Sequence, residues 1–136
     1  MALPKVILDT DILSAIMRRQ SAVIPTARAY LREHHQFHFS IITQYEILRG
    51  LKAKDATRQT ATFENFCSRN IILPLSEETI SKAAEIYADL YKRGELIGDA
   101  DILIAASAMV HGLGIVTNNE RHFQRISDLQ VENWLK

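Results

Sequence analysis

Val6-Ile7-Leu8-Asp9-Thr10-Asp11 joins a short apolar run to two carboxylates that flank a threonine. Strands that are buried on both faces of a parallel sheet are typically continuous apolar runs. Open α/β sheets bind ligands just beyond the carboxyl ends of such strands. Asp9 therefore occupies the position at which an α/β protein places its chemistry. Because an acid that ends a buried strand has little structural use, we expect Asp9 to be functional.

The overall composition is that of an ordinary globular domain, and we expect residues 1–136 to form a single domain with a substantial core. The 16 basic and 16 acidic residues balance, so composition lacks the basic excess that usually accompanies nucleic-acid binding. The single cysteine, Cys67, excludes an intramolecular disulfide and favours a reduced, cytoplasmic setting. We find no signal-peptide pattern and no run of about 20 apolar residues that would span a membrane.

Apolar patterning predicts short strands that alternate with helices. Strands are expected at 5–8, 37–42, 71–73, 115–117 and 129–134. Helices are expected at 11–19, 26–34, 43–51, 55–69, 76–93 and 101–111, with a turn or helical stub at 118–123. The spacing in the fifth helix predicts a buried face made of Ile80, Ala83, Ala84, Tyr87, Leu90 and Tyr91. This alternation favours an α/β fold with a parallel sheet and right-handed crossovers.

Acidic residues recur where the expected elements begin or end: Asp9 and Asp11, Glu46, and Asp99 with Asp101. In a parallel sheet these ends share one edge, so the acids should converge there. Converging carboxylates raise one another's pKa unless a cation lies among them. Mg²⁺ and Mn²⁺ prefer oxygen ligands, typically one or two carboxylates with water. The pattern therefore indicates a metal-assisted cleavage of phosphodiester bonds.

Several of these acids also have a structural interpretation. Thr43-x-x-Glu46 fits a capping box, in which Glu46 ties back to the helix start, and this role is compatible with a functional one. Residues two apart do not share a helix face, so we expect Asp101 to point into the site and Asp99 to cap its helix. Asp11 is a candidate cap for the helix that follows the first strand.

Two threonines, Thr10 and Thr117, lie at the ends of the first and fourth expected strands. Their hydroxyls either support the water at a metal site or simply close a turn, and the sequence leaves both roles open. The five histidines show no ligand spacing around the acids, so we interpret them as surface or hydrogen-bonded residues. No phosphate-binding loop, CxxC pair or Ser-His-Asp arrangement is visible.

Five motifs occur in order along the chain and span nearly all of it. They are Leu8-Asp9-Thr10-Asp11, then Tyr45-Glu46 with Arg49-Gly50, then Ile97-Gly98-Asp99-Ala100-Asp101-Ile102-Leu103-Ile104-Ala105-Ala106, then Val116-Thr117-Asn118-Asn119 with Phe123, and Leu129-x-x-Glu132-Asn133-Trp134. This set resembles the PIN-domain ribonucleases and, within them, the VapC toxins of bacterial type II toxin–antitoxin modules. The Asp-x-x-Ile-Ala-Ala run and the segment that ends at Phe123 are the most specific part.

The resemblance implies a three-layer α/β/α sandwich with a central parallel five-stranded sheet. It implies an endoribonuclease that depends on Mg²⁺ or Mn²⁺ and acts on transfer RNA or other structured RNA. It also implies a cytoplasmic homodimer that a cognate VapB-type antitoxin neutralises. Carried over by position, Asp9 and Asp101 hold the metal, and Glu46 completes the acidic set directly or through water. The family's fourth acid falls at Asn119, whose amide weakens the case for a second metal but can orient a water as a neutral acceptor.

The same resemblance gives the basic clusters a use, because substrate phosphates need cations around an acidic pocket. Arg49 and Lys52 lie three and six positions after Glu46, and Arg121 and Arg125 follow Asn119. We expect these four residues to contact RNA. Four further polar residues of the motifs are expected to support the site in a secondary role: Thr10, Asp11, Asp99 and Thr117.

Two alternatives stay open on sequence alone. A haloacid-dehalogenase-type phosphatase would use Asp9 as the nucleophile and Asp11 as the acid/base. That alternative is weakened because Leu13 stands where threonine or valine is expected, Glu46 has no role in it, and the chain is short for that fold. The other alternative is a non-catalytic PIN-like module that only binds RNA or protein, and the pair Asn118 and Asn119 is its only support.

Overall fold

The computed structural model describes residues 2–136, whose strands form one parallel five-stranded sheet. The strands are β1 (Val6–Leu8), β2 (His38–Ser40), β3 (Ile71–Leu73), β4 (Gly114–Val116) and β5 (Val131–Glu132), in the spatial order β3-β2-β1-β4-β5. The central strand β1 pairs with β2 on one side and with β4 on the other. The predicted α/β class and parallel sheet are therefore confirmed.

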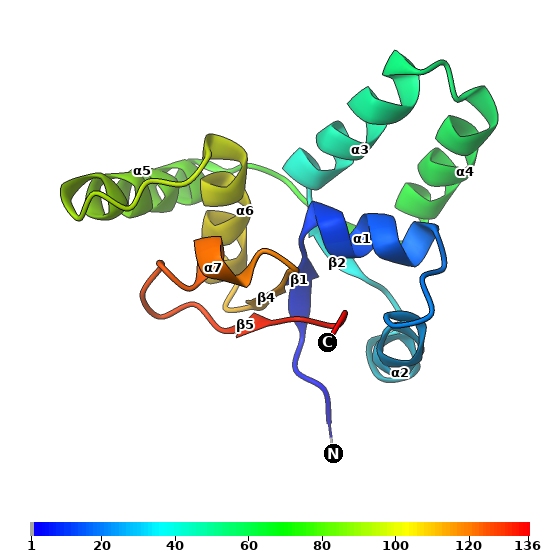
Figure 1. Ribbon diagram of the computed structural model, residues 1–136, viewed down its shortest axis with the longest axis horizontal. Helices are drawn as coiled ribbons and strands as arrows, with labels where there is room; N and C mark the ends of the chain where they lie inside the picture. The colour runs from blue at the N-terminus through cyan, green and yellow to red at the C-terminus, as the bar shows by residue number, and fades with distance from the viewer. Residues whose placement is uncertain (1) are drawn as a thin grey trace.

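Helices cover both faces of the sheet, as Figure 1 shows. The helices on one face are α1 (Thr10–Met17), α2 (Ile24–His34), α3 (Ile41–Ala53) and α4 (Thr57–Ser68); those on the other are α5 (Glu77–Lys92), α6 (Asp99–Val110) and α7 (Glu120–Phe123). Successive side chains of a strand point to opposite faces. Accordingly Val6 and Leu8 join the core beneath α1 and α2, while Ile7 joins the core beneath α5 and α6. This is the expected three-layer sandwich.

Two predicted strands are too long. β2 ends at Ser40, whose hydroxyl caps α3 by accepting a hydrogen bond from the Ile42 N–H at 3.0 Å. The β-branched Ile41 and Ile42 therefore start a helix, because the serine cap satisfies one of the free N–H groups of its first turn. In the C-terminal segment only Val131–Glu132 pairs with β4, and Trp134 turns into the core, where it is 6% exposed.

The predicted buried face of α5 is partly wrong. Its buried residues are Thr79, Ala83, Ile86 and Leu90, whereas the exposed ones include Ile80 at 49%, Tyr87 at 44% and Tyr91 at 63%. The helix carries two apolar stripes, and periodicity alone does not say which of them packs on α6. The outward stripe leaves Tyr87 and Tyr91 stacked on each other, with ring centroids 6.0 Å apart.

Two further features of the sequence are its single cysteine and the expected lack of a membrane-spanning segment. Cys67 is buried in α4. Among residues 2–136, no helix has both the length and the apolar character needed to cross a bilayer.

Candidate active site

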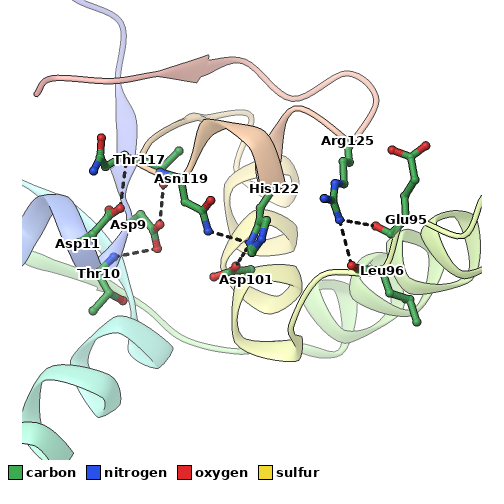
Figure 2. Close-up of polar contacts among 11 residues, drawn as sticks. Asp9, Thr10, Asp11, Glu95, Leu96, Asp101, Thr117, Asn119, His122 and Arg125 are labelled. Carbon is green, nitrogen blue, oxygen red and sulfur yellow. Dashed lines mark hydrogen bonds and ion pairs between the residues drawn. The ribbon is translucent and has the colours of Figure 1, made fainter. Parts of the chain in front are cut away.

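Asp9 follows β1 and is the N-cap residue of α1, with only 6% of its surface exposed. Its Oδ1 accepts a hydrogen bond from the Thr10 N–H at 2.8 Å, and its Oδ2 accepts one from the Thr117 hydroxyl at 2.7 Å. Thr117 follows β4, the neighbour of β1, and is completely buried. The two adjacent parallel strands therefore bring Asp9 and Thr117 together at one edge of the sheet, as Figure 2 shows.

Asp11 lies in the first turn of α1 but does not cap it, so that prediction is wrong: Asp9 already occupies the cap position. Instead, Asp11 Oδ2 accepts a hydrogen bond from the backbone N–H of Asn118 at 3.0 Å. Its other oxygen, Oδ1, is buried and has no hydrogen-bond partner among the described residues. A buried acceptor without a partner is costly, and an oxygen in this state suits a cation.

Asp101 lies in the first turn of α6, on the opposite face of the sheet from α1. The N-cap of α6 is Gly98, and Asp99 is the exposed first residue of the helix, so the prediction that Asp99 caps it is wrong. Asp101 Oδ2 lies 3.1 Å from the Nδ1 atom of His122, which in turn lies 2.7 Å from Asn119 Nδ2. Figure 2 shows these three side chains pointing toward one another.

His122 is a residue that the sequence interpretation missed as part of the site. The signal was present, because Asn119 and His122 are three positions apart and such pairs lie on one side of a helical turn. What the sequence lacked was any indication that this side of α7 faces Asp101, 21 positions earlier in the chain.

Glu46 extends from α3 toward α1, where its Oε1 accepts a hydrogen bond from the Thr10 hydroxyl at 2.6 Å. The predicted capping box is wrong, because Ser40 is the N-cap and Thr43 lies inside the helix, 3.1 Å from the Thr10 hydroxyl. Glu46 Oε2 lies 3.7 Å from the Arg49 guanidinium. The contact through Thr10 therefore connects Glu46 to the segment that carries Asp9.

The acids perturb one another electrostatically. The pKa of Asp9 is raised to about 7, chiefly by burial and then by the charge of Asp11, with a smaller effect from Asp101. The hydrogen bonds from Thr117 and Thr10 act in the opposite direction and stabilise the ionised form. The pKa of Asp11 is also raised, again mainly by burial. Three carboxyl groups thus share a region in which full ionisation is unfavourable.

The carboxylates of the site can be compared with the ligand set that a divalent cation prefers. Among residues 2–136, no three His, Cys, Asp or Glu side chains form a ready-made metal cluster. Mg²⁺ needs only one or two carboxylates, because it retains several waters. The raised pKa of Asp9 and the unpartnered Oδ1 of Asp11 are features that a cation would relieve. An oxygen-rich, carboxylate-based set therefore fits Mg²⁺ or Mn²⁺.

The basic residues expected to contact RNA differ in their surroundings. Lys52 on α3 and Arg121 on α7 are exposed to solvent. Arg125 donates through Nη1 to the backbone carbonyls of Glu95 and Leu96, at 3.2 and 3.1 Å. Arg125 therefore ties down the loop that leads into α6, a contact that Figure 2 also shows.

A groove of about 660 Å³ runs between α1, α3 and α4 and reaches the site at Thr10 and Glu46. Its lining combines apolar and basic side chains, among them Met17, Leu51, Phe63, Arg18, Lys54 and Arg58. Such a groove suits an extended or helical peptide that carries apolar side chains.

Thr117 provides a test of this geometry that requires no assumption about activity. We expect Thr117→Val to raise the pKa of Asp9 above about 7, because the hydroxyl that stabilises the ionised carboxylate is lost. We also expect a loss of about 1–3 kcal/mol in the free energy of unfolding, because the Asn119 N–H loses its acceptor. ¹³C NMR titration and urea unfolding measure the two effects. Thr10→Val is the matched control: it should leave the pKa of Asp9 unchanged, because the backbone N–H of residue 10 still donates to Asp9. An unchanged Asp9 pKa in Thr117→Val would contradict the assigned hydrogen bond between Thr117 and Asp9.

The chain resembles known proteins along nearly its whole length. The family model described as "PIN domain" matches residues 6–129. The chain is 36% identical over 132 residues to "Ribonuclease VapC2" of Haemophilus influenzae, covering 96% of this chain and 98% of that protein. It is 30% identical over 131 residues to "tRNA(fMet)-specific endonuclease VapC" of Shigella flexneri, with coverages of 96% and 98%.

A solved structure shares the fold. The match is to VapBC2 from Rickettsia felis bound to a DNA fragment from its promoter, with a TM-score of 0.84 and 27% sequence identity, covering 95% of this chain and 98% of that one. None of these relatives favours the phosphatase alternative or the binding-only alternative, since the two sequence relatives are named as a ribonuclease and an endonuclease.

Proposed function

This chain belongs to the PIN-domain family and to its VapC ribonucleases, and we propose that it is a Mg²⁺- or Mn²⁺-dependent endoribonuclease toxin that cleaves transfer RNA or other structured RNA. One observation carries the proposal: Asp9, Asp11 and Asp101 all contact residues 117–122. The Thr117 hydroxyl donates to Asp9 at 2.7 Å, the Asn118 N–H donates to Asp11 at 3.0 Å, and His122 Nδ1 lies 3.1 Å from Asp101 Oδ2. Such a cluster has a high energetic cost without a cation and a clear use with one.

The chain's own residues have distinct roles in this proposal. Asp9 and Asp101 would hold the metal, and Glu46 would complete the set directly or through water. When bound, the ion would supply an activated water and charge stabilisation at the phosphoryl oxygens. Thr117 holds the Asp9 carboxylate through its hydroxyl. Asn119, next to His122, presents an amide that would orient the attacking water as a neutral acceptor.

Substrate binding would use the exposed cations around the acids. Arg49 lies beside Glu46, with its guanidinium 5.2 Å from the centre of the Tyr45 ring. Lys52 and Arg121 are free in solvent to reach phosphates on either side of the site. Arg125 is a weaker candidate, because two backbone carbonyls already accept from its guanidinium.

A VapB-type antitoxin is the proposed protein partner, in keeping with the VapBC complex that shares the fold. We assign it to the groove between α1, α3 and α4, because apolar antitoxin side chains would fill the floor. A basic antitoxin side chain at the Glu46 end of the groove would then reach the carboxylates and replace the metal's charge. The proposal also includes a cytoplasmic homodimer, for which the outward stripe of Ile80, Tyr87 and Tyr91 on α5 is an available surface.

The decisive experiment incubates the purified, antitoxin-free chain with end-labelled transfer RNA. We expect discrete cleavage products with Mg²⁺ or Mn²⁺ and none after chelation by EDTA, because water activation depends on the cation. Cleavage that is unaffected by EDTA would contradict the metal dependence. A protein that binds labelled RNA without cleaving any tested substrate would point to the binding-only alternative, and release of phosphate from p-nitrophenyl phosphate would point to the phosphatase.

A further inference from the structure

The C-terminal motif Glu132-Asn133-Trp134 contains one amide side chain that reaches back toward the acids. Asn133 Nδ2 donates to Asn118 Oδ1 and to Glu120 Oε2, both at 3.0 Å. Its Oδ1 accepts a hydrogen bond from the Leu135 N–H at 2.9 Å. Since an amide NH₂ has two donors, both are committed to the segment that follows β4.

Asn133 is itself held on both sides. The carbonyl of Glu132 accepts a hydrogen bond from the Thr117 N–H at 2.8 Å, which continues the pairing of β5 with β4. On the other side Trp134 is buried, with its ring centroid 5.5 Å from that of Tyr30. The backbone at Asn133 is therefore fixed between a sheet contact and a core anchor, which is what a rigid support requires.

The turn that Asn133 contacts carries the hydrogen-bond donors for two of the acids. Within it, the Thr117 hydroxyl donates to Asp9 at 2.7 Å, and the Asn118 N–H donates to Asp11 at 3.0 Å. Among the described residues, the Asn118 side chain has one hydrogen bond, the one from Asn133. The Asn133 amide therefore holds Asn118 by its side chain, while the backbone N–H of the same residue donates to Asp11.

We propose that Asn133 is a positioning residue that clamps the 117–119 turn and thereby fixes the Asp11 and Asp9 carboxylates for catalysis. It acts through Asn118 and touches neither carboxylate. The structural part of this proposal stands on the hydrogen bonds alone. The catalytic part rests on the proposed nuclease function.

The most informative substitution is Asn133→Asp. Aspartate has nearly the same shape and keeps the Oδ1 acceptor for the Leu135 N–H, but it lacks both donors. It also places a carboxylate beside Glu120, whose pKa is held below its usual value by hydrogen bonds from Lys136 and Asn133. Lys136→Ala is the matched control, because it removes the 2.8 Å ion pair to Glu120 and leaves the Asn133 amide in place.

The first measurement is the hydrogen exchange of the Asn118 amide, followed by NMR in metal-free protein. We expect exchange at least about tenfold faster in Asn133→Asp and Asn133→Ala, and unchanged in Lys136→Ala, because release of the turn breaks the bond to Asp11. Urea unfolding of each variant separates local release from global destabilisation. Wild-type exchange in both Asn133 variants would overturn the proposal, as would acceleration spread evenly over the whole sheet.

The second measurement is RNA cleavage with saturating Mg²⁺. We expect Asn133→Asp to lower kcat by about 10–100-fold with little change in KM. Losses of this size are typical when a residue that orients a metal-binding side chain is replaced. Asn118→Ala should give a similar loss, and the double variant Asn118→Ala/Asn133→Ala should lose no more than either single variant. Additive losses would overturn the clamp. If the wild type cleaves no RNA, the nuclease proposal fails, while the exchange measurement still decides the structural part.

Discussion

Asp9→Asn will lower kcat for RNA cleavage by roughly a thousandfold, because the several kcal/mol that a metal ion contributes to the transition state correspond to about three powers of ten in rate. Asparagine keeps an oxygen that can accept from the Thr10 N–H, so the cap of α1 remains while the charge is lost. Asp101→Asn should have an effect of the same order. Single-turnover cleavage of labelled RNA measures both.

The losses of activity expected for Asp9→Asn and Asp101→Asn can be checked against a matched control. Glu64→Gln makes the same change of charge at an exposed acid of α4 outside the site and should retain wild-type activity. Circular dichroism and urea unfolding establish that each variant is folded. Mg²⁺-dependent cleavage that persists at the wild-type rate in both Asp9→Asn and Asp101→Asn would show that these acids do not hold the metal.

The second large effect is on stability as a function of pH in the absence of metal. Because the pKa of Asp9 rises from 3.8 to about 7 on folding, the folded protein binds more protons than the unfolded chain between these values. The unfolding free energy contributed by this group is therefore lost as the pH increases from about 4 to about 7, by at most about 4 kcal/mol. Below about pH 4 the stabilisation from protonated Asp9 is fully present. Above about pH 7 it has been lost, and the unfolding free energy no longer changes with the titration of this group.

Urea unfolding in EDTA at a series of pH values tests this, with Asp9→Asn as the reference. The difference in unfolding free energy between variant and wild type should increase across the window, because asparagine does not titrate there. Taking the difference removes the opposite trends from acids with lowered pKa, such as Asp89 and Glu120. Adding Mg²⁺ at pH 7 should restore stability to the wild type alone. Parallel pH curves for the two proteins would contradict the raised pKa.

Local pattern was sufficient for the elements that carry the principal acids. The three apolar residues of β1 are buried, and the strand ends at Leu8 because the next residue, Asp9, caps α1. α6 was predictable because its sequence is apolar nearly all round, which marks a buried helix, and Asp101 lies in its first turn. Because successive βαβ units are parallel and right-handed, those two acids were expected at one edge.

Caps and helix faces were not predictable in the same way. Asp11, Asp99 and, through the capping box with Glu46, Thr43 were each candidate N-caps by residue type. The N-cap is decided by which backbone leaves the helical conformation, and that residue is Asp9, Gly98 or Ser40. On α5 two apolar stripes compete, and only the presence of α6 selects the one with Ile86 and Leu90. Propensity and periodicity are properties of a segment, whereas these outcomes depend on its neighbours.

By itself, then, the sequence determined the fold class, the parallel order of strands and helices, and the placement of Asp9 and Asp101 at element ends. Only the tertiary structure decided which side chains support them. Thr117 meets Asp9 across 108 positions, His122 meets Asp101 across 21, and Asn133 meets Asn118 across 15. Such hydrogen bonds depend on the register of β1, β4 and β5 and on the directions of their turns, and directional contacts of about 3 Å have no counterpart in apolar periodicity.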